Sequence, residues 1–105
     1  MEIATKPKIS AFPKCYLEEI SCQRMSLFDW IEQARQLDCD GLEMYEGFFS
    51  NLEQSYLLEV RAAINQAGFE MPMLCCSPDF THPEPEKRAA AIEYQQKMIR
   101  VAYTL

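Results

Sequence analysis

Three short apolar segments recur at a fixed interval along this 105-residue chain. They start near Ile9, Gly41 and Met73, which are 32 residues apart in both intervals, from 9 to 41 and from 41 to 73. A segment with helical spacing follows each of them, so the expected order is a strand and a helix, three times over. Alternation of this kind favours parallel strands joined by right-handed crossovers. The repeat therefore predicts an α/β fold.

The sequence places the three strands at KISAFP (8–13), GLEMYEGFF (41–49) and FEMPMLCC (69–76). In the second strand, Leu42 and Met44 point one way and Glu43 and Tyr45 the other, which is the alternation of a strand. Pro72 lacks a backbone donor and is expected near the start of the third strand.

The helices are expected at 25–37, 52–66 and 84–105. Ser26 is positioned to cap the first, and Gly68 is positioned to end the second. Pro85 suits the first turn of the third. The first helix is expected to end near DCDG, where Asp38 or Asp40 can tolerate a left-handed turn and Gly41 adopts one easily. The predicted apolar stripes are Leu27, Trp30, Ile31, Ala34 and Leu37; Leu57, Val60 (or Arg61) and Ile64; and Ala91, Tyr94, Met98, Val101 and Leu105.

Eight units of this length would span about 250 residues, the typical size of a TIM barrel. Three parallel strands cannot close a barrel, and both edges of their sheet would stay open. We therefore expect residues 1–105 to be the N-terminal part of a single truncated domain. That part would be the first three βα units of a (β/α)8 TIM barrel. A complete, unusually short three-layer α/β domain is the alternative.

The charge of the chain argues against several classes of partner. The net charge is −6 and the isoelectric point is about 4.7, with no run of basic residues. Binding to nucleic acid or to an anionic membrane needs basic patches, so neither partner is expected. No apolar run approaches the ~20 residues of a membrane span, and MEIATKPKISAF has no signal-peptide pattern. The predicted location is the cytoplasm.

The cysteines favour reduced thiols. They are odd in number, with no secretory signal, which argues against a disulfide framework. The chain has one histidine, His82, and no CxxC pair. A zinc site built from this chain alone is therefore not expected. The cysteines are Cys15, Cys22, Cys39, Cys75 and Cys76.

Three stretches together resemble the sugar phosphate isomerase/epimerase family, which are xylose isomerase-like TIM barrels related to metal-dependent apurinic endonucleases. The stretches are DCDGLEMYEGFF, LEVRAAINQAGFEMPML and CCSPDFTHPEPEKRAAAIEYQQKMIRVAYTL. Glu43 matches the glutamate of the family's second strand, and Arg88 matches an arginine in the helix after the third. Asp38 departs from the family, which has a glycine there. The resemblance runs from about Ile9 to Leu105.

The resemblance implies a metal-assisted enzyme for the parent protein. A divalent cation (Mn, Mg, Zn or Co) would bind a small sugar, and two carboxylates would move a proton beside its carbonyl. The family's metal ligands lie on later strands, so no catalytic or metal-binding residue transfers to this chain. We expect the chain to bind no metal and to be inactive alone. The oligomeric state is left open.

Candidate pocket residues lie where strands of a barrel end. For Phe12 and Tyr45, stacking on a sugar and packing in the core are both open. Glu43 either contacts substrate or pairs with a neighbouring strand, and His82 either contacts substrate or caps a helix. One of Cys75 and Cys76 should face the helices and the other the barrel interior, with Cys76 as a pocket liner. The candidate set is Phe12, Glu43, Tyr45, Glu46, Cys76, Ser77 and His82.

Two other functions stay open. One is a phosphodiesterase-like endonuclease of the same fold, against which the acidic balance argues. The other is a non-catalytic partial barrel that uses its open sheet edge and an exposed helix stripe as a docking surface.

Overall fold

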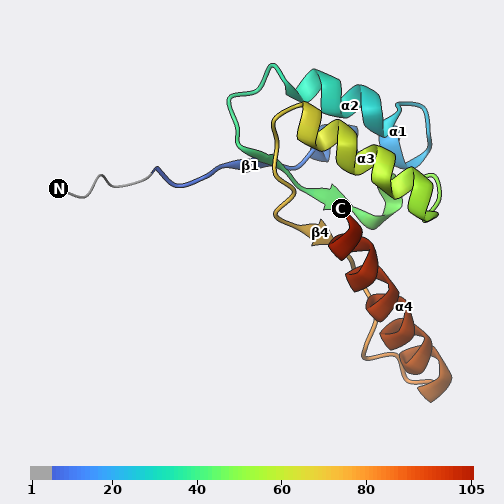
Figure 1. The fold of residues 1–105 in the computed structure, drawn as a ribbon. Coiled ribbons are helices and arrows are strands. Elements are labelled where there is room, and N and C mark those ends of the chain that lie inside the picture. The colour runs from blue at the N-terminus through green and yellow to red at the C-terminus, as the bar shows by residue number, and fades with distance from the viewer. Residues whose placement is uncertain (1–5) are drawn as a thin grey trace.

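The computed structural model describes residues 6–105 (Figure 1). Helices and strands alternate along the chain as the repeat predicts, with short 3-10 turns between them. The elements are β1 (Ser10–Ala11), η1 (Lys14–Tyr16), α1 (Leu17–Ser21), α2 (Leu27–Ala34), β2 (Gly41–Leu42), β3 (Met44–Tyr45), η2 (Glu46–Phe48), α3 (Gln54–Gln66), β4 (Leu74–Cys75) and α4 (Pro85–Thr104).

β2 and β3 form the middle strand of the sheet, interrupted only at Glu43. β1 pairs with β2 in parallel, and β4 pairs with β3 in parallel. The Glu43 N–H donates to the Ala11 carbonyl at 2.9 Å, whereas the Leu42 N–H donates to the Glu70 carbonyl at 2.8 Å. Successive N–H groups thus bind opposite neighbours, and the strands lie side by side in chain order. This confirms a parallel α/β arrangement.

The main core lies between these strands and the helices α2 and α3, which run next to each other over one face (Figure 1). The predicted stripes of α2 and α3 supply most of its helix residues, apart from Leu37, which is 46% exposed beyond the end of α2, and Leu57, which packs against α4 instead. The predicted stripe of α4 supplies none of the buried residues of this core. Leu42 and Met44 of the middle strand are fully buried beneath them. The buried helix residues of this core are Ile20, Leu27, Trp30, Ile31, Ala34, Val60 and Ile64.

Ser26 caps α2, as predicted: its Oγ accepts a hydrogen bond from the Phe28 N–H at 3.1 Å. The Ser26→Ala variant leaves that donor without a side-chain acceptor. We expect it to lower the free energy of unfolding by about 1 kcal/mol, measured by urea denaturation. Ser55→Ala, in the exposed first turn of α3, is the control. Equal losses in the two variants would contradict the capping role.

The turn after α2 differs from the prediction. Residues with positive φ within 6–105 are Gln23 (62°) and Gly68 (83°), so none of Asp38, Asp40 and Gly41 is left-handed. Asp40 instead accepts the Ile9 N–H on its Oδ2 at 2.8 Å. This bond ties the turn to the start of β1 and leaves the backbone free to enter β2 in an extended conformation.

The short helix α1 was not anticipated, because its surroundings read as a polar stretch. It carries one side chain into the core: Ile20 is fully buried, while Glu18 on the same turn is exposed. A helix of five residues is too short for helical periodicity to reveal it.

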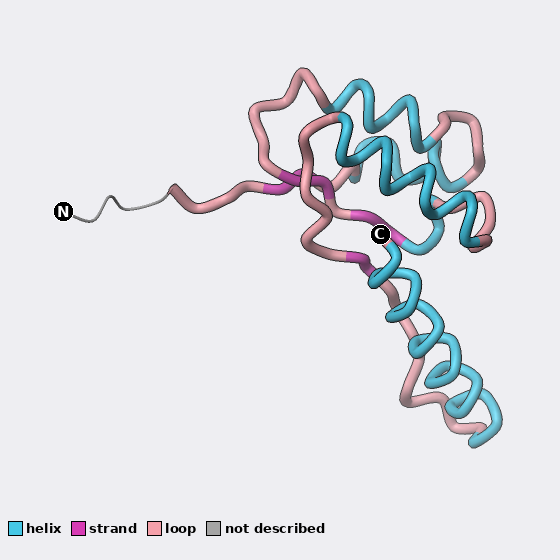
Figure 2. The backbone as a smooth tube through the Cα atoms, in the orientation of Figure 1, coloured by secondary structure: helices cyan, strands magenta, loops and turns pink. Residues whose placement is uncertain are grey.

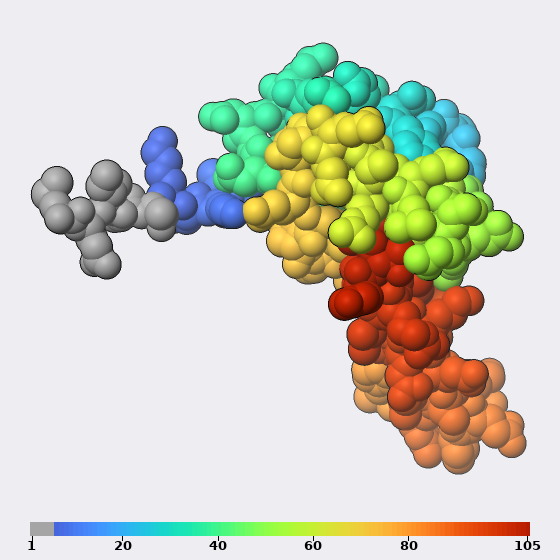
Figure 3. Space-filling view, viewed as in Figure 1, coloured from blue at the N-terminus to red at the C-terminus, as the bar shows by residue number. Residues whose placement is uncertain are grey.

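α4 stands apart from the rest of the molecule. Figures 1 and 2 show that it begins far beyond the end of β4 and runs back toward the sheet, beside the loop 76–84. Its buried residues, Met98 and Val101, lie in the second half and pack against Leu57 of α3. The radius of gyration is 15.8 Å, against about 13 Å for a compact chain of this length. The space-filling view shows the same projection (Figure 3).

None of the helices in residues 6–105 is long and apolar enough to cross a membrane.

Candidate functional site

The carboxyl ends of the three parallel strands meet at one edge of the sheet, where an aromatic cluster forms. The ring of Phe12, just after β1, stacks on Phe48 with centroids 5.9 Å apart. Tyr45 of β3 packs edge-on against the same ring at 5.6 Å. Phe48 is 1% exposed, so it anchors both half-buried rings. The structure thus brings two predicted pocket residues together, and both pack against the core.

Gly47 leaves room for this arrangement. A Cβ at Gly47 would lie 2.5 Å from the Cε1 atom of Tyr45. The Tyr45 ring therefore occupies space that any other residue at position 47 would fill. The glycine was not singled out by sequence reasoning, because only the folded chain shows which ring lies against it.

Alternation along β4 separates the two adjacent cysteines. Leu74 and Cys76 pack against the small cluster of Leu57, Met98 and Val101 between α3 and α4. Cys76 therefore lies on the helix side of the sheet, which differs from the prediction that it lines the barrel interior. Cys75 therefore lies on the other side of this strand. It is paired with Tyr45 in the register of β3 and β4. Ser77, the next residue, is exposed.

Glu46, Cys76 and Tyr94 come together between the strand ends and α4. Burial, together with the Glu46 carboxylate, raises the pKa of the Cys76 thiol. Burial and the same carboxylate raise the pKa of Tyr94 to about 12. The Oε2 atom of Glu46 is buried and has no hydrogen-bond partner within residues 6–105. The prediction that Tyr94 is a core residue is wrong, because its side chain is 41% exposed and lies beside Glu46. Helical spacing alone does not show this neighbour.

The pKa of the Tyr94 hydroxyl provides a test of this cluster. In Glu46→Gln the charge that disfavours the phenolate is gone, so the pKa of Tyr94 should fall from about 12 toward its ordinary value near 10. Ultraviolet titration of the tyrosines, with Tyr94→Phe to assign the signal, measures it. A raised pKa favours the folded state below about pH 10, and this stabilisation is lost as the pH rises through 12. Glu93→Gln is the control; an equal shift there would contradict the assignment.

Glu43 has a partner on the neighbouring strand. The Ser10 Oγ donates to the Glu43 Oε2 at 2.9 Å, in partly buried surroundings. A half-buried carboxylate needs such a partner, and this bond ties β1 to the middle strand. The structure thus gives Glu43 a structural contact below the carboxyl ends.

His82 is held in the loop before α4. Its Nδ1 accepts the Glu84 N–H at 3.1 Å, which supports the start of the helix. The Arg88 guanidinium donates to the carbonyls of His82 (2.7 Å) and Pro83 (3.1 Å). Arg88, noted only for its place in a family pattern, therefore fixes the loop and the orientation of the histidine.

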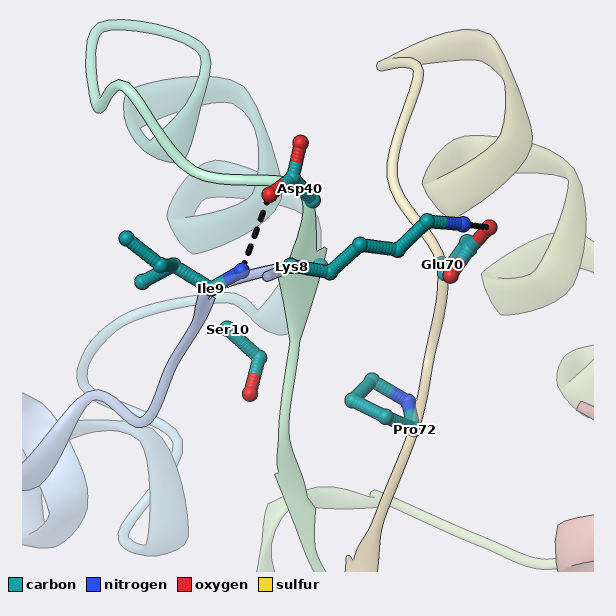
Figure 4. Close-up of a pocket in the computed structure, with 7 residues that line it drawn as sticks. Lys8, Ile9, Ser10, Asp40, Glu70 and Pro72 are labelled. Atoms are coloured by element: carbon teal, nitrogen blue, oxygen red, sulfur yellow. Dashed lines mark hydrogen bonds and ion pairs between the residues drawn. The ribbon is translucent and has the colours of Figure 1, made fainter. Parts of the chain in front are cut away.

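A pocket of about 80 Å³ lies at the opposite, amino-terminal edge of the strands (Figure 4). There Lys8 reaches across to Glu70, with Nζ and Oε1 2.7 Å apart. Asp40 and Ser10 line the same hollow, and Asp40 accepts the Ile9 N–H there. In barrels the amino-terminal edge serves stability and the carboxyl edge serves chemistry. We therefore assign this pocket a structural role.

The described residues do not provide a metal site. Within residues 6–105, no three His, Cys, Asp or Glu side chains converge closely enough to hold an ion. A divalent cation of the kind implied by the family resemblance does not fit this part of the protein.

The short parallel strands lie in chain order with helices over one face, which is an α/β arrangement of the kind that TIM barrels repeat. The chain belongs to the xylose isomerase-like TIM barrel family, whose model matches residues 31–105. This confirms the family resemblance seen in the sequence. The family is one of sugar-processing enzymes. A comparison with curated proteins gave no match.

Proposed function

We propose that this chain supplies the first three βα units of a barrel that isomerises or epimerises a small sugar or sugar phosphate. The cluster of Phe12, Tyr45 and Phe48 at the carboxyl ends of the strands carries the proposal. In this class of barrel the substrate lies over that edge. Within residues 6–105, β1 and β4 each pair on one side only, which leaves both sheet edges open for the further strands of a barrel.

The role of these residues is to bind and orient the substrate. Sugar rings present apolar C–H faces that pack well on aromatic rings, and the Tyr45 hydroxyl adds a donor and an acceptor. Because Phe12 and Tyr45 are held by Phe48, their rings are fixed before substrate arrives. Fixed contacts of this kind lower the entropic cost of binding.

Proton transfer next to the sugar carbonyl needs groups beyond these. The carboxylates of the described strands are engaged or turned away: Glu43 accepts from Ser10, and Glu46 lies against Tyr94. We propose that the acid, the base and any divalent cation come from other strands of the barrel. No step of the reaction is assigned to residues 6–105.

The experiment is a kinetic one on the complete reading frame, including whatever follows Leu105. Epimerisation of ketoses and ketose phosphates is measured with Mn²⁺, with Mg²⁺ and with a chelator. We expect Tyr45→Phe to raise KM about tenfold with kcat little changed, because it removes binding common to ground and transition states. Tyr56→Phe, on the helix side at α3, is the control. Absence of turnover with either metal overturns the proposal.

A further inference from the structure

The start of α4 is held by the loop before it, because the buried residues of this helix lie in its second half. The partly buried side chains of residues 85–97 lie three and four positions apart, on one face of α4: Arg88, Ala91 and Gln95. Arg88 donates to two carbonyls of the loop 76–84, so this face lies against that loop. A helix end with few buried contacts opens locally at a low cost in free energy.

His82 supplies a hydrogen-bond acceptor at this helix end. Its Nδ1 atom accepts the N–H of Glu84, the N-cap residue, at 3.1 Å. The Glu84 side chain forms no capping hydrogen bond, and its carboxylate lies 3.7 Å from the Lys87 Nζ instead. A ring nitrogen accepts only while it carries no proton. The capping ring of His82 is therefore neutral, with its proton on Nε2.

Protonation of His82 removes this acceptor. Histidine is the side chain that changes charge between about pH 5 and 8. The imidazolium carries a proton on both nitrogens, so Nδ1 becomes a donor that faces the Glu84 N–H. Its positive charge also lies near the positive N-terminal end of α4 and near the Arg88 guanidinium, and both repel it. The protonated ring therefore no longer caps the helix.

Asp79 offers the protonated ring a different partner. Its Oδ1 atom accepts the hydroxyl of Thr81 at 2.9 Å and the N–H of Thr81 at 3.0 Å. These bonds, helped by the charge of His82, hold the pKa of the Asp79 carboxyl below its usual range. The carboxylate is therefore charged wherever histidine titrates, and its second oxygen can accept a charged N–H. The charged groups around His82 are Asp79 in its own loop and Glu84 and Arg88 at the start of α4.

We propose that His82 is a pH-sensitive cap of α4. While its ring is neutral, it binds the Glu84 N–H and holds the loop 76–84 against the helix. Once protonated, the ring leaves Glu84 for Asp79, and the first turn of α4 loosens. The loop and the helix start lie beyond the carboxyl ends of the strands (Figure 2). A fall in pH therefore loosens the segment that borders this edge of the sheet.

Hydrogen exchange of single backbone amides, measured by NMR between about pH 8 and 5 on the product of the complete reading frame, tests the cap. The informative amides are those of Glu84, bound to the ring, and of Lys87 and Arg88, bound to the Glu84 carbonyl. After correction for the intrinsic pH dependence of exchange, their protection should fall about fivefold to tenfold. The measurement needs no substrate, so its outcome is independent of the proposed isomerase or epimerase activity.

Three variants separate the cap from other effects of acid, because all of them keep the glutamates of α4. In His82→Asn the side-chain oxygen accepts the N–H two residues later at any pH, so protection should stay constant. In His82→Ala the acceptor is missing, so protection should be low throughout. In Asp79→Asn the alternative partner loses its charge, so protection should be lost at a lower pH than in the unsubstituted protein.

Two results contradict the proposal. One is protection in the unsubstituted protein that does not fall between about pH 8 and 5. The other is a fall of equal size in His82→Asn, which would assign the change to the carboxylates. Circular dichroism at pH 8 checks that each variant keeps the fold.

Discussion

Replacing Phe48 by alanine is expected to lower the free energy of unfolding by about 3–5 kcal/mol. Phe48 is 1% exposed, and it is the one ring on which both Phe12 and Tyr45 rest. Its loss leaves a cavity at the point where the ends of β1 and β3 meet. A domain of about 100 residues is stable by roughly 5–15 kcal/mol, so this single change removes much of the total.

Urea denaturation followed by tryptophan fluorescence measures this loss. The control is Phe80→Ala, because Phe80 is 50% exposed in the loop before α4. Exposed substitutions of this kind stay within about ±0.5 kcal/mol. Loss of stability by the same amount in both variants would contradict the anchoring role of Phe48. The tyrosine and phenylalanine rings should also become mobile in Phe48→Ala, as broadened side-chain resonances would show.

Replacing Gly41 by alanine is the second change with a large expected effect. A Cβ at this position would lie 2.8 Å from the Glu70 carbonyl oxygen and 3.1 Å from the Pro72 Cδ. The first of these atoms is backbone and already accepts the Leu42 N–H at 2.8 Å. The segment at Glu70 and Pro72 then has to move away from the middle strand, which breaks the hydrogen bonds between them. We expect a loss of roughly 2–4 kcal/mol from overpacking and broken backbone bonds together.

Gly47→Ala is the matched comparison for Gly41→Ala. Its added Cβ also meets atoms at short distance, but these belong to the Tyr45 side chain, which can rotate. Its cost in stability should be clearly smaller, while the Tyr45 ring is displaced. Hydrogen exchange at residues 70–75 should rise in Gly41→Ala alone. If both variants lost the same free energy of unfolding and showed the same hydrogen exchange at residues 70–75, the close approach of the second and third strands would be unimportant for stability.

Local patterns were sufficient to predict the long helices and the strand order. The buried faces of α2 and α3 follow from apolar residues three and four positions apart, and the 32-residue repeat indicated parallel strands. The short α1 was missed, because its single buried residue, Ile20, has no periodic partner. The turn at Asp38 and Asp40 was also misassigned, since nothing local shows that Asp40 is bound to the Ile9 N–H.

The candidate site was predicted less well than the fold. Strand ends could be located, so Phe12 and Tyr45 were correctly placed at the carboxyl ends of the strands, while their role as pocket residues stays a prediction. Which way the side chains leave the sheet depends on the register and on α4. Cys76 turned out to pack toward the helices, and Glu46 lies against Tyr94, which is 48 positions away in the sequence (46 to 94). Contacts between such distant positions depend on the three-dimensional path of the chain.

The middle strand also sets the order in which this sheet can form. Its N–H groups alternate between the two outer strands, so β1 and β4 are joined only through it. Ser10 to Gly41 spans 31 positions and Met44 to Leu74 spans 30, so the two loop closures cost almost the same entropy. Neither outer strand has a strand to pair with until residues 41–45 adopt their extended conformation. Destabilising changes in the middle strand are therefore expected to slow folding, and those in the outer strands to speed unfolding.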